Sequence, residues 1–239
     1  MFKKYERALA FEIFILREYR IIDEIILNSK TILDIGWHFW FFSLYVLLIK
    51  SWFYNLDEPV SLDNLEELVD ISTLNDDFCI HFFEPVKDHF SNAKSLLSKF
   101  WSNIIFNNYW ILNISGDYEI QKPKISSQSS IYNSFLNKDW IKELSKFIRL
   151  DEYIKNNNIQ QIDLLKMDIE WAEFDVLLEL NDNLFSKIKV IFIEYHILDE
   201  TFERKFDELM GKLSKIYNNI KVIQSKYNKD LGYILFKSF

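Results

Sequence analysis

Polar side chains recur where the predicted strands of this chain end. Five predicted strands are short apolar runs, and each finishes on residues that can donate or accept hydrogen bonds. These residues are Asp34 and Gly36, Glu84, Asn107 and Asn108, Asp168 and Glu170, and Glu194 and His196. In an open α/β sheet, ligands bind beyond the carboxyl ends of the parallel strands. The repeated pattern therefore predicts a ligand site at one edge of the sheet.

Glu84, at the end of the second predicted strand, is the strongest single candidate for ligand binding. A carboxylate at this place can accept hydrogen bonds from both hydroxyls of a ribose. The structural alternative is that Glu84 is a helix N-terminal partner ahead of Pro85. Asp34 can bond a cofactor amine, or it can brace the loop that follows the first strand.

Two pairs of residues are candidates for proton transfer. Glu194 and His196 lie two apart on a predicted strand, so their side chains point to the same face. A histidine beside a carboxylate is a candidate general base because its pKa lies near neutrality, with an ordinary surface residue as the alternative. Asp168 and Glu170 can hold a metal, bind substrate or act as a base, or they can satisfy loop amides and cap the next helix.

Seven tryptophans lie where glycine is more usual, and the chain has only 4 glycines in 239 residues. Trp37 and Trp40 follow the first strand in place of a glycine-rich nucleotide loop, and Trp171 interrupts a polar run. Trp101 follows a helical pattern where a left-handed glycine commonly ends a helix. An indole cannot replace glycine where φ is positive or where a ligand approaches the backbone. We therefore hypothesise that the gene reads UGA as glycine and that these tryptophans are misread UGA codons, an idea that UGG codons at positions 37, 40 and 171 would exclude.

Strand-like and helical patterns alternate along most of the chain. Strands are predicted at residues 31–36, 78–84, 103–107, 162–168, 189–195, 220–223 and 233–236. This alternation predicts an α/β fold with a mostly parallel sheet, and the closeness of the last two strands predicts that one is antiparallel. A loop is predicted at residues 121–137. An N-terminal helical extension is predicted at residues 1–30, and the main domain at residues 31–239.

The composition excludes several classes of protein. A net charge of −8 and a pI near 5.1 argue against a nonspecific nucleic-acid binder. The single cysteine, Cys79, excludes an intramolecular disulfide framework and a multi-cysteine zinc site, and no metal site is predicted. No stretch reaches the roughly 18 unbroken apolar residues of a membrane span, and Glu12 in the apolar N-terminal stretch argues against a signal peptide. We therefore predict a cytoplasmic protein without an integral membrane segment.

Read with glycine at the tryptophan positions, the chain resembles the FkbM family of methyltransferases over about residues 30–236. The matching segments are Ile32–Gly36 with Phe41–Leu44, Phe83–Pro85, Arg149–Tyr153, Ile162–Glu170 with Ala172 and Glu173, and Glu194–His196. The first segment is common to many methyltransferases. The run Lys-Met-Asp-Ile-Glu-x-Ala-Glu that begins at Lys166 is much more specific.

The resemblance implies a Rossmann-like class I methyltransferase fold, S-adenosylmethionine as cofactor, and transfer of its methyl group to a hydroxyl of a sugar, polysaccharide or small metabolite. It implies that the loop from Gly36 to Trp40 surrounds the methionine part of the cofactor. His196, with Asp168 as the second choice, would remove the hydroxyl proton. The cofactor-binding candidates are Asp34, Gly36, Trp37, Trp40, Glu84 for the ribose and Asn108 near the adenine.

Two other functions stay open at this point. If Trp37, Trp40 and Trp171 are genuine, their indoles fill the cofactor space, and overpacking by even a few methylenes costs roughly 1–3 kcal/mol. The chain would then be an inactive binding or scaffold protein with a methyltransferase fold. A nicotinamide-dependent dehydrogenase would carry a three-glycine fingerprint with an acid roughly 20 residues later. The interval from Gly36 to Glu84 is far longer than that.

Overall fold

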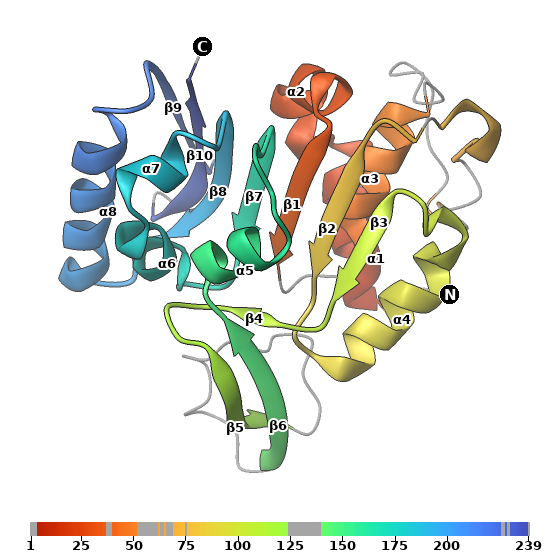
Figure 1. Ribbon diagram of the computed structural model, residues 1–239, viewed down its shortest axis with the longest axis horizontal. Coiled ribbons are helices and arrows are strands. Elements are labelled where there is room, and N and C mark those ends of the chain that lie inside the picture. Colours follow the sequence, from red (N-terminus) through yellow and green to blue (C-terminus); the bar gives the residue numbers. More distant parts are fainter. Residues whose placement is uncertain are drawn as a thin grey trace.

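A seven-stranded sheet forms the centre of the protein (Figure 1). The computed structural model describes residues 4–36, 40–51, 62, 65, 69–74, 76–123, 140–225, 228 and 230–238. The sheet strands are β1 (Thr31–Gly36), β2 (Cys79–Phe83), β3 (Ile104–Asn107), β7 (Leu164–Asp168), β8 (Val190–His196), β9 (Asn219–Gln224) and β10 (Leu231–Lys237). They lie in the order β3-β2-β1-β7-β8-β10-β9. The first five are parallel, and β10 is antiparallel to both β8 and β9, which confirms the predicted mostly parallel α/β sheet.

The order of the strands reverses between β1 and β7. From β1 the chain proceeds outward through β2 to β3, and it later returns to β7 beside β1 and proceeds the other way to β8. Such a switch point separates the loops that follow the two central strands, and it is where open α/β sheets bind ligands. In the register of β1 and β7, Gly36 lies opposite Asp168, so the switch point falls at these two residues.

Helices cover both faces of this sheet. Residues of α1 (Lys4–Ala10), η1 (Phe11–Ile15), η2 (Glu18–Ile22), α2 (Asp23–Asn28), α3 (Phe41–Lys50), α4 (Lys87–Leu97) and η5 (Ser98–Phe100) contribute to one apolar cluster. Residues of α5 (Leu150–Asn156), α6 (Glu173–Glu179), α7 (Asp182–Phe185) and α8 (Glu200–Leu213) contribute to the other. A further short helix, η4, spans Ile71–Thr73.

The N-terminal helical extension is more broken than the sequence predicts. One or two helices are expected over residues 5–29, whereas the structure has four short pieces. The break falls at Arg17, whose left-handed φ of 54° cannot continue a helix. Arg17 is ion-paired to Asp23, and the hydroxyl of Tyr45 on α3 donates to the same carboxylate, so these N-terminal helices are held against α3.

A second, three-stranded sheet lies beyond the carboxyl ends of β1, β2 and β3 (Figure 1). It consists of β4 (Trp110–Ile111), β5 (Gly116–Pro123) and β6 (Trp140–Ile148), in the order β4-β6-β5. The prediction of a loop from residue 121 is wrong for residues 121–123, because β5 continues there and pairs with β6. Residues 124–139 lie outside the described residues.

Within the described residues, none of the helices has the length and apolar character needed to cross a membrane.

Candidate functional site

The predicted site residues on β1, β7 and β8 lie on one face of the sheet. Successive side chains of a strand point to opposite faces, so Asp34 shares a face with Ile32, and Asp168 shares one with Leu164. Both apolar residues belong to the cluster under α3. By the same alternation Glu194 and His196 lie on the face of Phe192, which is in that cluster too. The structure thus brings these four residues to the same face at the carboxyl edge.

Asp34 is buried and doubly partnered. The hydroxyl of Ser43 on α3 donates to one carboxylate oxygen at 2.6 Å, and the ammonium of Lys166 lies 3.9 Å from the other. Burial raises the pKa of Asp34, and Lys166 and Ser43 oppose that rise. Gly36 lies close to this pair: a Cβ at this position would lie 2.9 Å from the Lys166 nitrogen, so a larger residue would require the ammonium to shift.

Glu84 follows β2 directly and is buried, with 1% of its surface exposed. One of its carboxylate oxygens accepts a hydrogen bond from the backbone N–H of Val86 at 2.8 Å, which is the structural role weighed for it. Burial raises the pKa of Glu84 well above its ordinary value, and the charge of Asp34 raises it further. The side-chain amide of Asn108 donates to the backbone carbonyls of Glu84 and Pro85, at 2.8 and 3.0 Å. Asn108 therefore braces the segment that carries Glu84.

The end of β7 carries the motif that is most specific for the resemblance. Lys166 donates to Asp168 at 3.3 Å, and both side chains are buried. Glu173, at the start of α6, accepts a hydrogen bond from the backbone N–H of Ile169 at 2.6 Å and so closes the turn after the strand. Burial, with the charge of Asp168, raises the pKa of Glu170 to about 7.

His196 has the properties of a neutral imidazole. Burial lowers its pKa, and the charge of Asp168 partly offsets that fall. Its Nε2 atom lies 3.9 Å from a carboxylate oxygen of Glu194, and its buried Nδ1 atom has no hydrogen-bond partner among the described residues. A neutral, partly buried imidazole can accept a proton, whereas the carboxylate of Asp168 is already engaged by the ammonium of Lys166.

The described tryptophans differ in how well they fit a glycine position. Trp171 has a φ of 87° and follows Glu170 at 54°, which is left-handed backbone that favours glycine. Trp40 is buried at the start of α3 with a φ of −69°, which suits any residue. The expectation of a left-handed backbone at Trp101 is wrong, because its φ is −57° and its ψ −26°. Trp37 lies outside the described residues.

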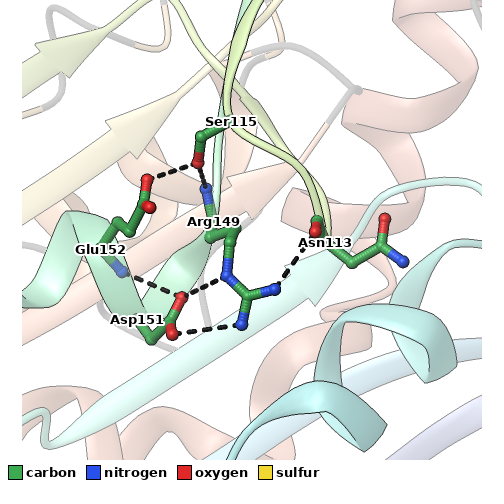
Figure 2. A network of polar contacts seen from close by, with 5 residues as sticks. All are labelled: Asn113, Ser115, Arg149, Asp151 and Glu152. Atoms are coloured by element: carbon green, nitrogen blue, oxygen red, sulfur yellow. Dashed lines mark hydrogen bonds and ion pairs between the residues drawn. The ribbon is translucent and has the colours of Figure 1, made fainter.

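The segment Arg149–Tyr153 joins the second sheet to the domain (Figure 2). The Arg149 guanidinium donates to both carboxylate oxygens of Asp151, at 3.0 and 3.2 Å, and to the backbone carbonyl of Asn113. The Ser115 hydroxyl accepts from the backbone N–H of Arg149 at 2.9 Å and donates to Glu152 at 2.5 Å. These contacts of the Arg149–Tyr153 segment, which is one of the segments that resemble the FkbM family, therefore hold the start of β5 and the end of β6 against α5.

Sequence reasoning overlooked three polar residues of this face. Lys166 was visible as a lone lysine inside an apolar strand, with Leu165 and Met167 on either side. Glu18 and Tyr233 are hydrogen-bonded to each other, and the charges of Asp168 and Lys166 act on Glu18. No local pattern could have placed Glu18 here, because it comes from the N-terminal extension.

Among the residues that the structure describes, no three His, Cys, Asp or Glu side chains are grouped so that they could hold a metal ion.

Comparison with known proteins identifies the family. The family model described as "Methyltransferase FkbM domain" matches residues 72–235, which is more than half of the chain. The chain belongs to this family. An FkbM-domain methyltransferase is an enzyme that transfers a methyl group from S-adenosylmethionine, so the predicted family, class of enzyme and cofactor are confirmed. The family membership and the strand order of the sheet also confirm the predicted Rossmann-like class I methyltransferase fold.

The chain is also similar to individual proteins. A segment of 48 residues is 46% identical to the AMB antimetabolite synthetase AmbE of Pseudomonas aeruginosa, which is 20% of this chain but 2% of that protein. Among solved structures, the methyltransferase FkbM of Methylobacillus flagellatus is 16% identical over 87% of this chain and 43% of that one, with a TM-score of 0.49. The O-methyltransferase of Bacillus cereus, solved with SAH, is 7% identical over 99% of this chain and 92% of that one, also with a TM-score of 0.49. At these TM-scores the structural likenesses carry no argument about this chain.

Proposed function

We propose that this FkbM-domain methyltransferase is an O-methyltransferase that acts on a hydroxyl of a sugar, a polysaccharide or a small metabolite. The observation that carries the proposal is the pairing of a neutral, partly buried His196 with carboxylates on the same face of the sheet. A hydroxyl needs a base to remove its proton as it attacks, and such a base contributes typically 10²–10⁴-fold to the rate. We assign this role to His196 and keep Asp168 as the second candidate.

The residues present fit a cationic nucleoside cofactor. The carboxylates of Asp34 and Glu84 lie at the ends of the neighbouring strands β1 and β2, and they suit a positive charge and a ribose diol respectively. We assign cofactor binding to Asp34, Gly36, Glu84 and Asn108, with Trp37 and Trp40 flanking the same loop. When bound, S-adenosylmethionine supplies the methyl group as a sulfonium.

We assign cofactor binding to residues at the ends of β1 and β2, and acceptor binding and proton transfer to residues at the ends of β7 and β8. Asp34 and Glu84 hold the cofactor, and Asn108 keeps the segment of Glu84 in place through its two backbone hydrogen bonds. Asp168 and Glu194 orient the acceptor through hydrogen bonds to its hydroxyls, and His196 takes the proton. Orientation of the acceptor oxygen can supply roughly 7–11 kcal/mol of such a barrier. We propose residues 31–239 as the methyltransferase domain, with residues 1–30 as its N-terminal extension, and a cytoplasmic location without a nucleic-acid partner.

Calorimetry and product analysis test this function. The purified protein should bind S-adenosylhomocysteine, and Glu84→Gln should weaken binding at least tenfold, which is about 1.4 kcal/mol. Asp117→Asn, which removes an exposed carboxylate of β5, is the matched control and should leave the affinity unchanged. A protein that ignores S-adenosylhomocysteine altogether would be the scaffold alternative.

The position of the transferred methyl tests the finer proposal. Incubation with S-adenosylmethionine and a panel of hydroxyl-bearing and amine-bearing sugars should give products methylated on oxygen, identified by the methyl resonance in NMR spectra. His196→Ala should lower the rate by about 10²-fold or more while S-adenosylhomocysteine still binds. Products methylated on nitrogen would contradict the O-methyl assignment.

A further inference from the structure

Lys166 is a buried cation between the two halves of the site. Only 3% of its surface is exposed, and it lies directly opposite Asp34 in the register of β1 and β7. Its ammonium is 3.9 Å from Asp34, which belongs to the cofactor half, and 3.3 Å from Asp168, which belongs to the acceptor half. A lysine is almost never buried unless it is paired, and here the pairing joins two strands that meet at the switch point.

The surroundings of Lys166 are shaped to hold this ammonium. A Cβ at Gly36 would lie 2.9 Å from the Lys166 nitrogen, so the glycine leaves room for the ammonium in its present position. The ring of Phe42 on α3 lies 5.6 Å from the same nitrogen, at a distance where a cation is attracted to an aromatic face. The ammonium is thus enclosed by both central strands and by the helix that follows the cofactor loop.

The positive charge of Lys166 interacts electrostatically with carboxyl groups on several elements. These groups are Asp34 on β1, Asp168 on β7, Glu194 on β8, Glu84 after β2, Glu170 after β7 and Glu18 on η2. Burial disfavours the charge of each buried carboxylate, and a nearby cation offsets that cost. Removing the cation would leave the closest carboxylates buried with less compensation.

We propose that Lys166 is a positioning residue for methyl transfer: it holds the carboxylates of Asp34 and Asp168 in one fixed relation, so that the cofactor half and the acceptor half of the site stay aligned. This role rests on the proposed function of the two halves. Lys166 acts through its two partners and does not touch the reacting atoms.

The first test measures the affinity for S-adenosylhomocysteine against pH in the parent and in Lys166→Met. The ammonium opposes the effect of burial on Asp34, so its loss raises the pKa of that carboxyl further. We expect Lys166→Met to bind several-fold more weakly than the parent at low pH and to approach the parent as the pH rises, because a protonated Asp34 no longer attracts the amine of the ligand. A loss of affinity that is the same at every pH would overturn the proposal, because a merely structural lysine would act without regard to pH.

The second test is a double-mutant cycle on folding, measured by urea unfolding without any ligand. Asp168→Asn should restore stability to Lys166→Met, with a coupling of about tenfold in the folding equilibrium constant. The matched control is Lys205→Met with Asp175→Asn, a half-buried pair with its atoms 2.7 Å apart, whose coupling should be at most about fivefold. If Lys166→Met does not fold but the double variant does, the ammonium is needed to compensate Asp168, which supports the proposal.

The outcomes separate this proposal from the proposed function. A double variant that is no more stable than Lys166→Met, or that also fails to fold, means that Lys166 matters only for packing, and it overturns the positioning role. A parent protein that does not bind S-adenosylhomocysteine contradicts the proposed function, whatever the cycle shows. A parent that binds, with a variant that binds equally well at all pH values, contradicts the role of Lys166 alone.

Discussion

The two faces of the central sheet come from the same strands but carry different chemistry. On the face covered by α3 and the N-terminal extension, Asp34, Lys166 and Asp168 are buried charged residues. On the opposite face, the residues one step along the same strands are Leu33, Leu165 and Met167, and they pack against α5 and α6. A shift of one residue along a strand is therefore the difference between the site and the apolar core.

A buried network of neutral polar groups on the opposite face sharpens this contrast. His81 on β2 lies opposite Leu33, and its Nδ1 atom is 2.8 Å from the hydroxyl of Tyr153. That hydroxyl donates to Asn107 at 3.1 Å. Burial lowers the pKa of His81 to about 4, so it carries no charge at neutral pH. The sheet thus accepts buried charge on the face where opposite charges meet, and buried neutral hydrogen bonds on the other.

Met167→Lys should break this contrast with the largest effect. Met167 is fully buried and lies one residue from Lys166, but it belongs to the apolar cluster that includes residues of α5 and α6. An unpaired ammonium there should cost about 5 kcal/mol or more of unfolding free energy, which is the whole stability of many domains. Urea unfolding followed by circular dichroism measures the loss.

Met167→Leu is the control for Met167→Lys. It conserves volume and should cost less than about 1.5 kcal/mol. A Met167→Lys protein of near-parental stability would mean that the two faces tolerate charge equally, and the contrast would fail.

Glu173→Gln tests a buried carboxyl group whose raised pKa is not offset by a nearby cation. Burial raises the pKa of Glu173 to about 8, and the charges of Asp168 and Glu170 add to the rise. The folded pKa lies above the ordinary value of 4.5, so the stability from protonated Glu173 is complete below pH 4.5 and is lost as the pH rises through 8. Glutamine mimics the protonated acid and can still accept the hydrogen bond from Ile169.

We expect Glu173→Gln to be more stable than the parent at pH 8, by on the order of 2 kcal/mol, and to depend less on pH between 5 and 8. Unfolding by urea at several pH values in this range measures both effects. Glu208→Gln, an exposed change on α8, should leave the pH dependence as it is in the parent. If Glu173→Gln and the parent lose stability in parallel as the pH rises, the raised pKa of Glu173 is wrong.

The strands of the central sheet, and the polar residues at their ends, could be predicted from the sequence because buried parallel strands are near-continuous apolar runs. The polar residues that end those runs, from Asp34 to His196, were predicted to share one edge, and the five parallel strands bring them there. The strand β6 was missed, because its alternating sequence follows a long polar segment and pairs with β5 across residues 124–139. Its pairing partner could not be read from either segment alone.

The centre of the site was harder to predict than its edge. A lysine in an apolar run is visible, but its importance depends on β1 and β7 being neighbours, which the chain order does not reveal. Glu18 is further from any sequence signal, because its place at the site depends on long-range contacts such as the packing of Tyr19 against Phe42, Phe192 and Tyr233. Long-range pairing and packing, rather than local propensity, decide which carboxylates share one cation.

Trp171 lies between the two faces and gives the smallest expected effect. Its indole packs on the apolar cluster under α5 and α6, and its ring lies 6.4 Å from that of His196 on the charged face. Trp171→Gly and Trp171→Ala both remove the indole, and they differ only by a Cβ at a φ of 87°. Glycine should therefore be the more stable of the two by about 1 kcal/mol, as measured by thermal or urea unfolding.

Trp101 supplies the matched pair with the opposite sign. It is 77% exposed with right-handed backbone, so Trp101→Ala should be more stable than Trp101→Gly by roughly 0.5–1 kcal/mol. If alanine is favoured at both positions, the left-handed backbone at 171 does not require glycine, and the misreading hypothesis loses its structural support. If glycine is favoured at 171 and alanine at 101, the codon at position 171 decides whether the tryptophan there is genuine. A UGA codon there would replace the strain with the glycine that the turn after β7 favours, whereas a UGG codon would make the strain a property that this site retains at a cost of order 1–3 kcal/mol.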